Sequence, residues 1–114
     1  MTAAKFRELA LRLPESAEGA HMGHPDFRVG GKIFASLGPG EAWGMVKLSP
    51  ARQASWIREA PDAFEPSAGA WGRRGETKVH LAAARTPLVR RALADAWRHV
   101  APRALVEEYG EAIT

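Results

Sequence analysis

Cysteine is absent from this chain of 114 residues. Its absence excludes disulfide bonds, thiol catalysis, iron–sulfur clusters and zinc sites with cysteine ligands, and it fits a reducing compartment. No apolar run approaches the roughly 20 residues that a membrane helix needs. The first residues also lack the apolar segment of a secretory signal. We therefore expect a cytoplasmic protein with no membrane partner.

Motifs of the common catalytic classes are missing as well. The chain contains no Gly-x-Ser-x-Gly nucleophile elbow and no Gly-x-x-x-x-Gly-Lys-Ser/Thr phosphate loop. The strongest enzyme-like feature is the pair His21 and His24, with Asp26 close by. Residues three apart on a strand point to opposite faces, so a shared metal ion would require a turn near Pro25. We expect a protein that is not an enzyme and binds no metal or cofactor.

Acidic residues are scarce in one part of the chain. The formal net charge is only +3. Between Trp71 and Arg103, however, eight basic residues stand against two acidic ones. A basic segment of this kind attracts phosphate groups. It is equally compatible with an ordinary solvated surface, because arginine is the usual basic residue of this chain.

Helical signals mark three main segments. An apolar stripe with helical spacing predicts the first helix. Ser49 before Pro50 is a strong N-cap signal for the second, and Thr86 before Pro87 repeats this signal for the last. The predicted helices span residues 3–13, 50–60 and 87–101, with one more short turn or helix at 103–109.

The clearest strand signal is a pair of short segments on either side of Gly30-Gly31. Two glycines suit a tight hairpin turn, because both central positions can take positive φ. A two-residue turn sets Phe27 opposite Phe34 and places Arg28 and Lys32 on opposite faces. A bulge would shift this pairing by one residue and reverse the assignment of faces.

The remaining segments complete an alternating order of helices and strands. Strands are predicted at 42–48 and 77–81, with a short one at 20–23. Residues 15–19 are expected to form a polar connection, residues 62–70 an irregular segment, and residues 71–76 a loop or hairpin. The chain therefore reads as helix, three strands, helix, two strands, helix. This order predicts an α+β fold, with an antiparallel sheet of about five strands and helices on one face, in a single domain of residues 1–114.

Several motifs together resemble the MmcQ/YjbR family of small bacterial proteins. They are Gly23-His24-Pro25 with Phe27, Val29-Gly30-Gly31-Lys32 and Phe34-Ala35; Val46-Lys47-Leu48; Gly72-Arg73-Arg74-Gly75 with Lys78-Val79 and Leu81; and Trp97-Arg98 with Val100-Ala101-Pro102. The resemblance extends from Phe6 to about Leu105. It implies a two-layer α-β3-α-β2-α fold, similar to secretion-chaperone-like and frataxin-like (CyaY-like) folds.

The same resemblance implies a function. Members of the family are often labelled DNA-binding, from a proposed double-wing arrangement. One position of this chain departs from the pattern: many members carry an aromatic residue where this chain has Glu76. The acidic side chain weakens the case for base stacking or phosphate binding by this particular loop.

We therefore expect weak, sequence-tolerant binding of DNA or another nucleic acid. Phosphate contacts need cations spaced along an exposed surface. The residues expected to supply them are Arg28, Lys32, Lys47, Arg73, Arg74 and Lys78. Trp43 and Trp71 are candidates for stacking on unpaired bases. Because large aromatic side chains are usually mostly buried, we expect both to be packing residues instead.

The alternative hypothesis is a protein-interaction or chaperone-like module that binds no nucleic acid. Its partner would be another protein or a second copy of this chain. An exposed sheet face carrying Phe34, Trp43 and Met45 would supply the apolar patch. Cations gathered on one face would support the first hypothesis, and cations scattered around an apolar patch would support the second.

Overall fold

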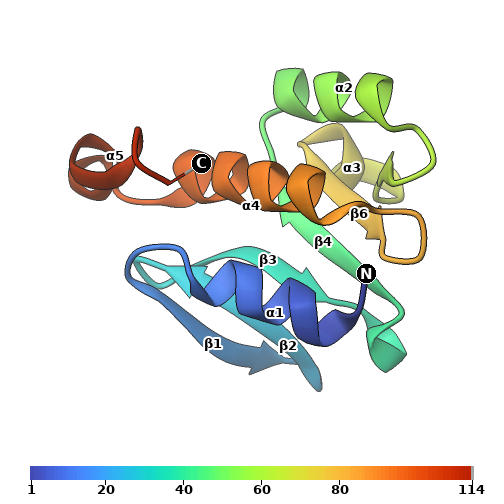
Figure 1. Cartoon of the computed structure of the whole chain (residues 1–114), viewed down its shortest axis with the longest axis horizontal. Helices are drawn as coiled ribbons and strands as arrows, with labels where there is room; N and C mark the ends of the chain where they lie inside the picture. The colour runs from blue at the N-terminus through green and yellow to red at the C-terminus, as the bar shows by residue number, and fades with distance from the viewer. Residues whose placement is uncertain (114) are drawn as a thin grey trace.

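The computed structural model describes residues 1–113 and contains a six-stranded antiparallel sheet covered by helices (Figure 1). In chain order the elements are α1 (Ala3–Leu11), β1 (Ser16–His21), β2 (His24–Val29), β3 (Lys32–Leu37), the 3-10 turn η1 (Pro39–Glu41), β4 (Trp43–Lys47), α2 (Pro50–Glu59), β5 (Phe64–Pro66), α3 (Gly69–Arg73), β6 (Glu76–His80), α4 (Thr86–Val100) and α5 (Arg103–Tyr109). Across the sheet the strands follow the order β1-β2-β3-β4-β6-β5. The predicted α+β class is confirmed, whereas the order of elements differs from the prediction.

Two strands and one short helix account for the difference in order. β1 begins inside the segment predicted as a polar connection and pairs along its whole length with β2. Its side chains are mostly exposed, so it carries no apolar alternation that would mark it as a strand. β5 lies in the segment expected to be irregular, and α3 lies where a loop or hairpin was expected. The first group of strands therefore has four members, and a helix separates β5 from β6.

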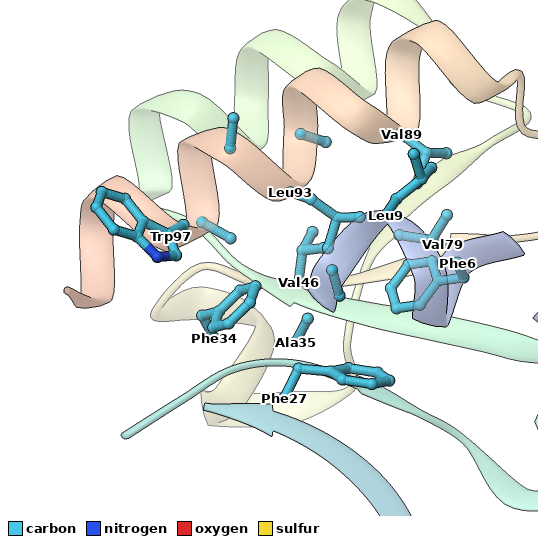
Figure 2. Packing of buried hydrophobic residues seen from close by; sticks show 14 of the residues in the cluster. Phe6, Leu9, Phe27, Phe34, Ala35, Val46, Val79, Val89, Leu93 and Trp97 are labelled. Atoms are coloured by element: carbon cyan, nitrogen blue, oxygen red, sulfur yellow. The ribbon is translucent and has the colours of Figure 1, made fainter. Parts of the chain in front are cut away.

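The hydrophobic core lies between one face of the sheet and the helices α1 and α4. In Figure 2, Leu93 and Trp97 of α4 face Phe34 and Val46 of the sheet, and Phe6 of α1 lies in the same layer. All five side chains are fully buried. Burial of each large apolar side chain contributes about 1.5–3 kcal/mol. The apolar stripes predicted for the first and last helices therefore form the core as expected.

A bulge in the β2–β3 hairpin decides which β3 side chains reach this core. Val29 pairs with Lys32 next to the turn, as predicted, but Phe27 pairs with Ala35 rather than with Phe34. The predicted pairing of the two phenylalanines is therefore wrong. The register shift beside Phe27 leaves one extra residue in β3, which bends the strand locally. As a result, Phe34 and Ala35 are both fully buried although they are adjacent.

The helix starts agree with the sequence signals in one case and differ in the other. Ser49 caps α2, since its Oγ accepts a hydrogen bond of 3.2 Å from the N–H of Arg52. Thr86 does not cap α4, because the helix already includes it and Arg85 holds the cap position without a side-chain hydrogen bond.

Across residues 1–113, no helix is both long enough and apolar enough to span a bilayer.

A buried carboxylate lies on the sheet face opposite the core. Asp26 is fully buried and accepts hydrogen bonds of 2.8 and 3.0 Å from the guanidinium of Arg28. The Nδ1 atom of His21 lies 2.9 Å from the same carboxylate. The hydrogen bonds from Arg28 lower the pKa of Asp26, against the opposing effect of burial, and His21 lowers it further. The carboxylate in turn holds Arg28 in a defined position.

The two histidines of the His21-x-x-His24 motif lie on the same side of the sheet. They pair directly across the β1–β2 turn, with ring centroids 6.3 Å apart. The opposite-faces argument assumed that both histidines lie on one strand, whereas the turn between β1 and β2 falls between them. Even so, residues 1–113 contain no group of three or more His, Asp or Glu side chains arranged to hold a metal ion.

Replacing Asp26 should change both the stability and its pH dependence. Because the folded-state pKa of Asp26 is lowered, its contribution is present above the unfolded pKa of about 3.9 and is lost as the pH falls through the folded value. We expect Asp26→Asn to reduce the unfolding free energy at neutral pH by about 1–3 kcal/mol. Between neutral pH and acid, the unfolding free energy of the variant should fall less than that of the parent. Urea unfolding at neutral pH and at about pH 3 checks both expectations, and parallel pH profiles would contradict them.

A second prediction concerns the close packing of α1 on β4. A Cβ atom at Gly44 would lie 2.8 and 2.9 Å from ring atoms of Phe6, which is fully buried. Gly44→Ala should therefore destabilise the fold by about 1–3 kcal/mol through overpacking. Thermal unfolding measures this loss. Combining it with Phe6→Leu should cost less than the sum of the two single changes, and strict additivity would argue against the contact.

Candidate nucleic-acid interface

Strand ends from distant parts of the sequence meet at one edge of the sheet. β2 ends at Val29 and β3 begins at Lys32, while β4 ends at Lys47 and β6 begins at Glu76. Neighbouring antiparallel strands run in opposite directions, so the end of each lies beside the start of the next. The N–H of Leu48 donates to the carbonyl of Gly75 at 3.1 Å and continues the pairing of β4 and β6 beyond the strands.

A cleft with a volume of about 550 Å³ opens at this edge. Its lining comes from the β2–β3 turn, the junction of β4 with β6, the helix α3, and the last turn of α4 at His99 and Val100. This volume falls within the range of sites that hold small ligands. His99 is exposed on the surface of the helix. Its place in the cleft depends on how α4 lies on the sheet, which no local pattern reveals.

Four of the six predicted phosphate-binding residues line this cleft: Arg28, Lys32, Lys47 and Arg74. Arg28 is already paired with Asp26. Within residues 1–113, none of the ion pairs involves Lys32, Lys47 or Arg74. Among the described residues, three cations in the cleft therefore form no ion pair within 4 Å of a carboxylate.

Arg28 and Lys32 reach the same cleft from opposite sides of the hairpin. Arg28 pairs with Ile33 and Lys32 pairs with Val29, so the two basic side chains lie on opposite faces of the hairpin, as predicted. Both line the cleft because it extends around the turn end of the hairpin, where Gly31 also contributes to the lining. The turn therefore brings Arg28 and Lys32 to one site although their side chains lie on opposite faces of the hairpin.

The other two predicted residues, Arg73 and Lys78, lie elsewhere. Arg73 is exposed on α3, next to Arg74. The Nζ atom of Lys78 lies 4.7 Å from the ring centroid of Trp43 and 4.0 Å from the carboxylate of Glu65. The cation–π contact and the ion pair hold Lys78 on the open face of the sheet, two residues along β6 from the cleft. The six cations therefore do not form one continuous group.

Trp71 is 60% exposed and lines the cleft, so the expectation that it packs in the interior is wrong. In the short helix α3 the buried residue is Gly72 rather than Trp71. A Cβ atom at Gly72 would overlap the carbonyl of Ser67, so this close approach requires glycine. The guanidinium carbon of Arg74 lies 5.6 Å from the Trp71 ring centroid. Trp43, by contrast, is half-buried, as expected of a packing residue.

Glu76 adds a carboxylate to the lining of the cleft. It lies opposite Lys47 in the pairing of β4 with β6. Its negative charge opposes anion binding at the site, as its position in the sequence motif suggested. Trp71, five residues earlier, nevertheless supplies an aromatic ring to the same cleft.

The apolar patch expected under the protein-interaction hypothesis is not formed by the predicted residues. Phe34 is fully buried in the core, and Met45 is only 6% exposed. The ring of Trp43 is half-buried and lies beneath the ammonium group of Lys78. These three side chains therefore do not present a joint apolar surface.

Comparisons with known proteins place this fold among its relatives. No curated protein matches the chain. Among solved structures, the crystal structure of Deinococcus radiodurans protein DR2400, with a DUF419 domain, is similar: 18% sequence identity, 99% of this chain and 94% of that chain covered, and a TM-score of 0.75. At this identity the likeness concerns the fold alone. The family model described as YjbR matches residues 11–99, well over half of the chain, and the chain therefore belongs to the YjbR family.

Proposed function

We propose that the protein binds DNA or another nucleic acid weakly and with little sequence preference, through phosphate contacts in the cleft. The observation that carries the proposal is the convergence of Arg28, Lys32, Lys47 and Arg74 from separate parts of the chain. The proposal is one of binding and not of catalysis. It assigns no role to a metal or a cofactor.

Unpaired cations favour an anionic ligand. Lysine and arginine side chains offer only hydrogen-bond donors, and contacts with phosphate oxygens are charge-assisted. Among the described residues, Lys32, Lys47 and Arg74 have no acidic partner within 4 Å, so a ligand phosphate does not have to displace one. Each phosphate neutralised in this way also releases counterions from the nucleic acid.

The geometry of the cleft also favours sequence tolerance. Contacts with phosphate set position and carry no direct sequence information. Sequence-specific proteins commonly place a helix in the major groove. Here α4 reaches the cleft only with its last turn, and α3 spans five residues. We therefore expect similar affinities for unrelated sequences of the same length.

Salt dependence and charge reversal test the proposal together. We expect the affinity for short DNA strands to fall as salt rises, with a log–log slope of about −2 to −4 for three or four phosphate contacts. Lys32→Glu combined with Lys47→Glu should lower the affinity at low salt by at least about tenfold and flatten the slope by about 2. Fluorescence anisotropy across a salt series measures both quantities.

The matched control reverses the same amount of charge away from the cleft. Arg58 on α2 and Arg85 before α4 are exposed, and α4 is about 22 Å long, so Arg85 lies far from the helix end that borders the cleft. Arg58→Glu combined with Arg85→Glu should change the affinity much less than the cleft double variant. Equal losses of affinity for the two double variants would show that binding depends on net charge alone. Undetectable binding by the parent at low salt would refute the proposal.

Removing the carboxylate of Glu76 should have the opposite effect. It is the main-chain carbonyl of Glu76 that accepts hydrogen bonds from Gln53 and Ser67, so Glu76→Gln leaves these contacts in place. We expect the variant to bind DNA about two- to fivefold more tightly at low salt, the range expected for one partly exposed charge. The same anisotropy assay measures the change, and an unaltered or weaker affinity would place the phosphate away from β6.

A further inference from the structure

We infer that the cleft accepts one unpaired nucleotide of a single strand, with its base stacked on Trp71 and its phosphates near Lys32, Lys47 and Arg74. This inference rests on the proposed function and specifies the form of nucleic acid that the site prefers. It depends on the placement of one aromatic ring beside the unpaired cations.

Trp71 has the exposure of a binding residue rather than a packing residue. It is 60% exposed, whereas Trp56 and Trp97 are buried. An exposed indole ring in a cationic cleft offers a stacking surface, and stacking tolerates any base because every base has a π face. The guanidinium of Arg74 next to the ring places a donor for phosphate close to the stacked base.

Buried hydrogen bonds beneath α3 hold the main chain next to Trp71. The side-chain amide of Gln53, on α2, donates to the carbonyls of Gly72 and Glu76 at 2.9 and 3.1 Å and lies 3.2 Å from Thr77 Oγ1. Gln53 is only 9% exposed, so these bonds are shielded from water. They fix the main chain at Gly72, the residue next to Trp71, and at Glu76, where β6 begins. A stacking platform positioned before binding loses less conformational freedom when the ligand arrives.

The size of the cleft and the chemistry of bases favour an unpaired nucleotide over a duplex. In a duplex both faces of each base are covered by its neighbours, so a ring such as Trp71 reaches a base face only when the base is unstacked. A volume of about 550 Å³ suits a ligand of small-molecule size. The cations around it then contact the phosphates on either side of the bound nucleotide.

The test compares strands that differ only in their bases. Three probes of equal strand length are used: a single strand of thymidines, an abasic strand with the same phosphates, and a duplex of mixed sequence. The parent should prefer the thymidine strand over the other two. Trp71→Ala should weaken binding of the thymidine strand by roughly 5- to 100-fold, as the loss of one stacked base predicts. The same change should leave the affinity for the abasic strand within about twofold, because the phosphate contacts remain.

Two further variants separate stacking from general effects. Trp71→Phe keeps an aromatic ring and should retain most of the preference for thymidines. Met22→Ala removes an apolar side chain that is 91% exposed at the β1–β2 turn, the opposite end of the sheet, and should change no affinity. Thermal unfolding of each variant checks that the fold is intact. We expect the fold to tolerate these changes at Trp71, because its side chain is exposed.

The outcomes distinguish this inference from the function on which it rests. Equal binding of thymidine and abasic strands, or equal losses for both with Trp71→Ala, would overturn the stacking inference while leaving phosphate binding in place. Binding of free thymidine monophosphate as tightly as the strand would overturn it in favour of a small-molecule site. Absence of binding to all three probes at low salt would refute both the inference and the proposed function.

Discussion

Antiparallel pairing of β2, β3, β4 and β6 is the constraint on which the cleft depends. It places the start of β3 and the end of β4 at one edge of the sheet. Lys32 and Lys47 meet there although nearly all of β3 and β4 lies between them in the chain. α4 packs over β3 and β4 and ends at the same edge, where it closes one side of the cleft. A shift of register in any of these pairings would separate the basic side chains.

Two glycines explain why the segment between β5 and β6 can border the site. A Cβ atom at Gly72 would overlap the carbonyl of Ser67, and a Cβ atom at Gly75 would overlap the carbonyl of Leu48. Gly75 also has φ +113°, a conformation that side-chain-bearing residues rarely adopt. The Gly-Arg-Arg-Gly motif is thus a packing motif as much as a charge motif. Gly75 lets the chain approach the end of β4 and Gly72 lets α3 approach Ser67, and Arg74 between them lines the cleft.

Sequence patterns predicted the parts of this structure that depend on local periodicity, and missed those that depend on distant contacts. The core stripes of α1 and α4 and the cap at Ser49 follow from spacing and residue type alone. The edge strand β1 is held mainly by main-chain pairing and so carries no apolar signature. Neither the bulge next to Phe27 nor the contact of Gln53 with Gly72 beneath α3 leaves a local pattern in the sequence. Arg28, Lys32 and Lys47 still reached one site, because the turn and the strand ends that carry them were assigned correctly, whereas Arg74 reaches it from a helix that was predicted as a loop or hairpin.

The buried Asp26 has a consequence for the cost of ordering side chains at the cleft. A free arginine side chain loses as much as about 2 kcal/mol of rotamer entropy when it is immobilised. Because Arg28 is already held by two hydrogen bonds to Asp26, that loss occurs when the chain folds and not when a ligand binds. Lys32, which is exposed and has no such partner among the described residues, must be ordered by the ligand itself. The cleft thus combines a cation that is ordered on folding, Arg28, with one that the ligand must order, Lys32, an arrangement that tolerates ligands of differing shape.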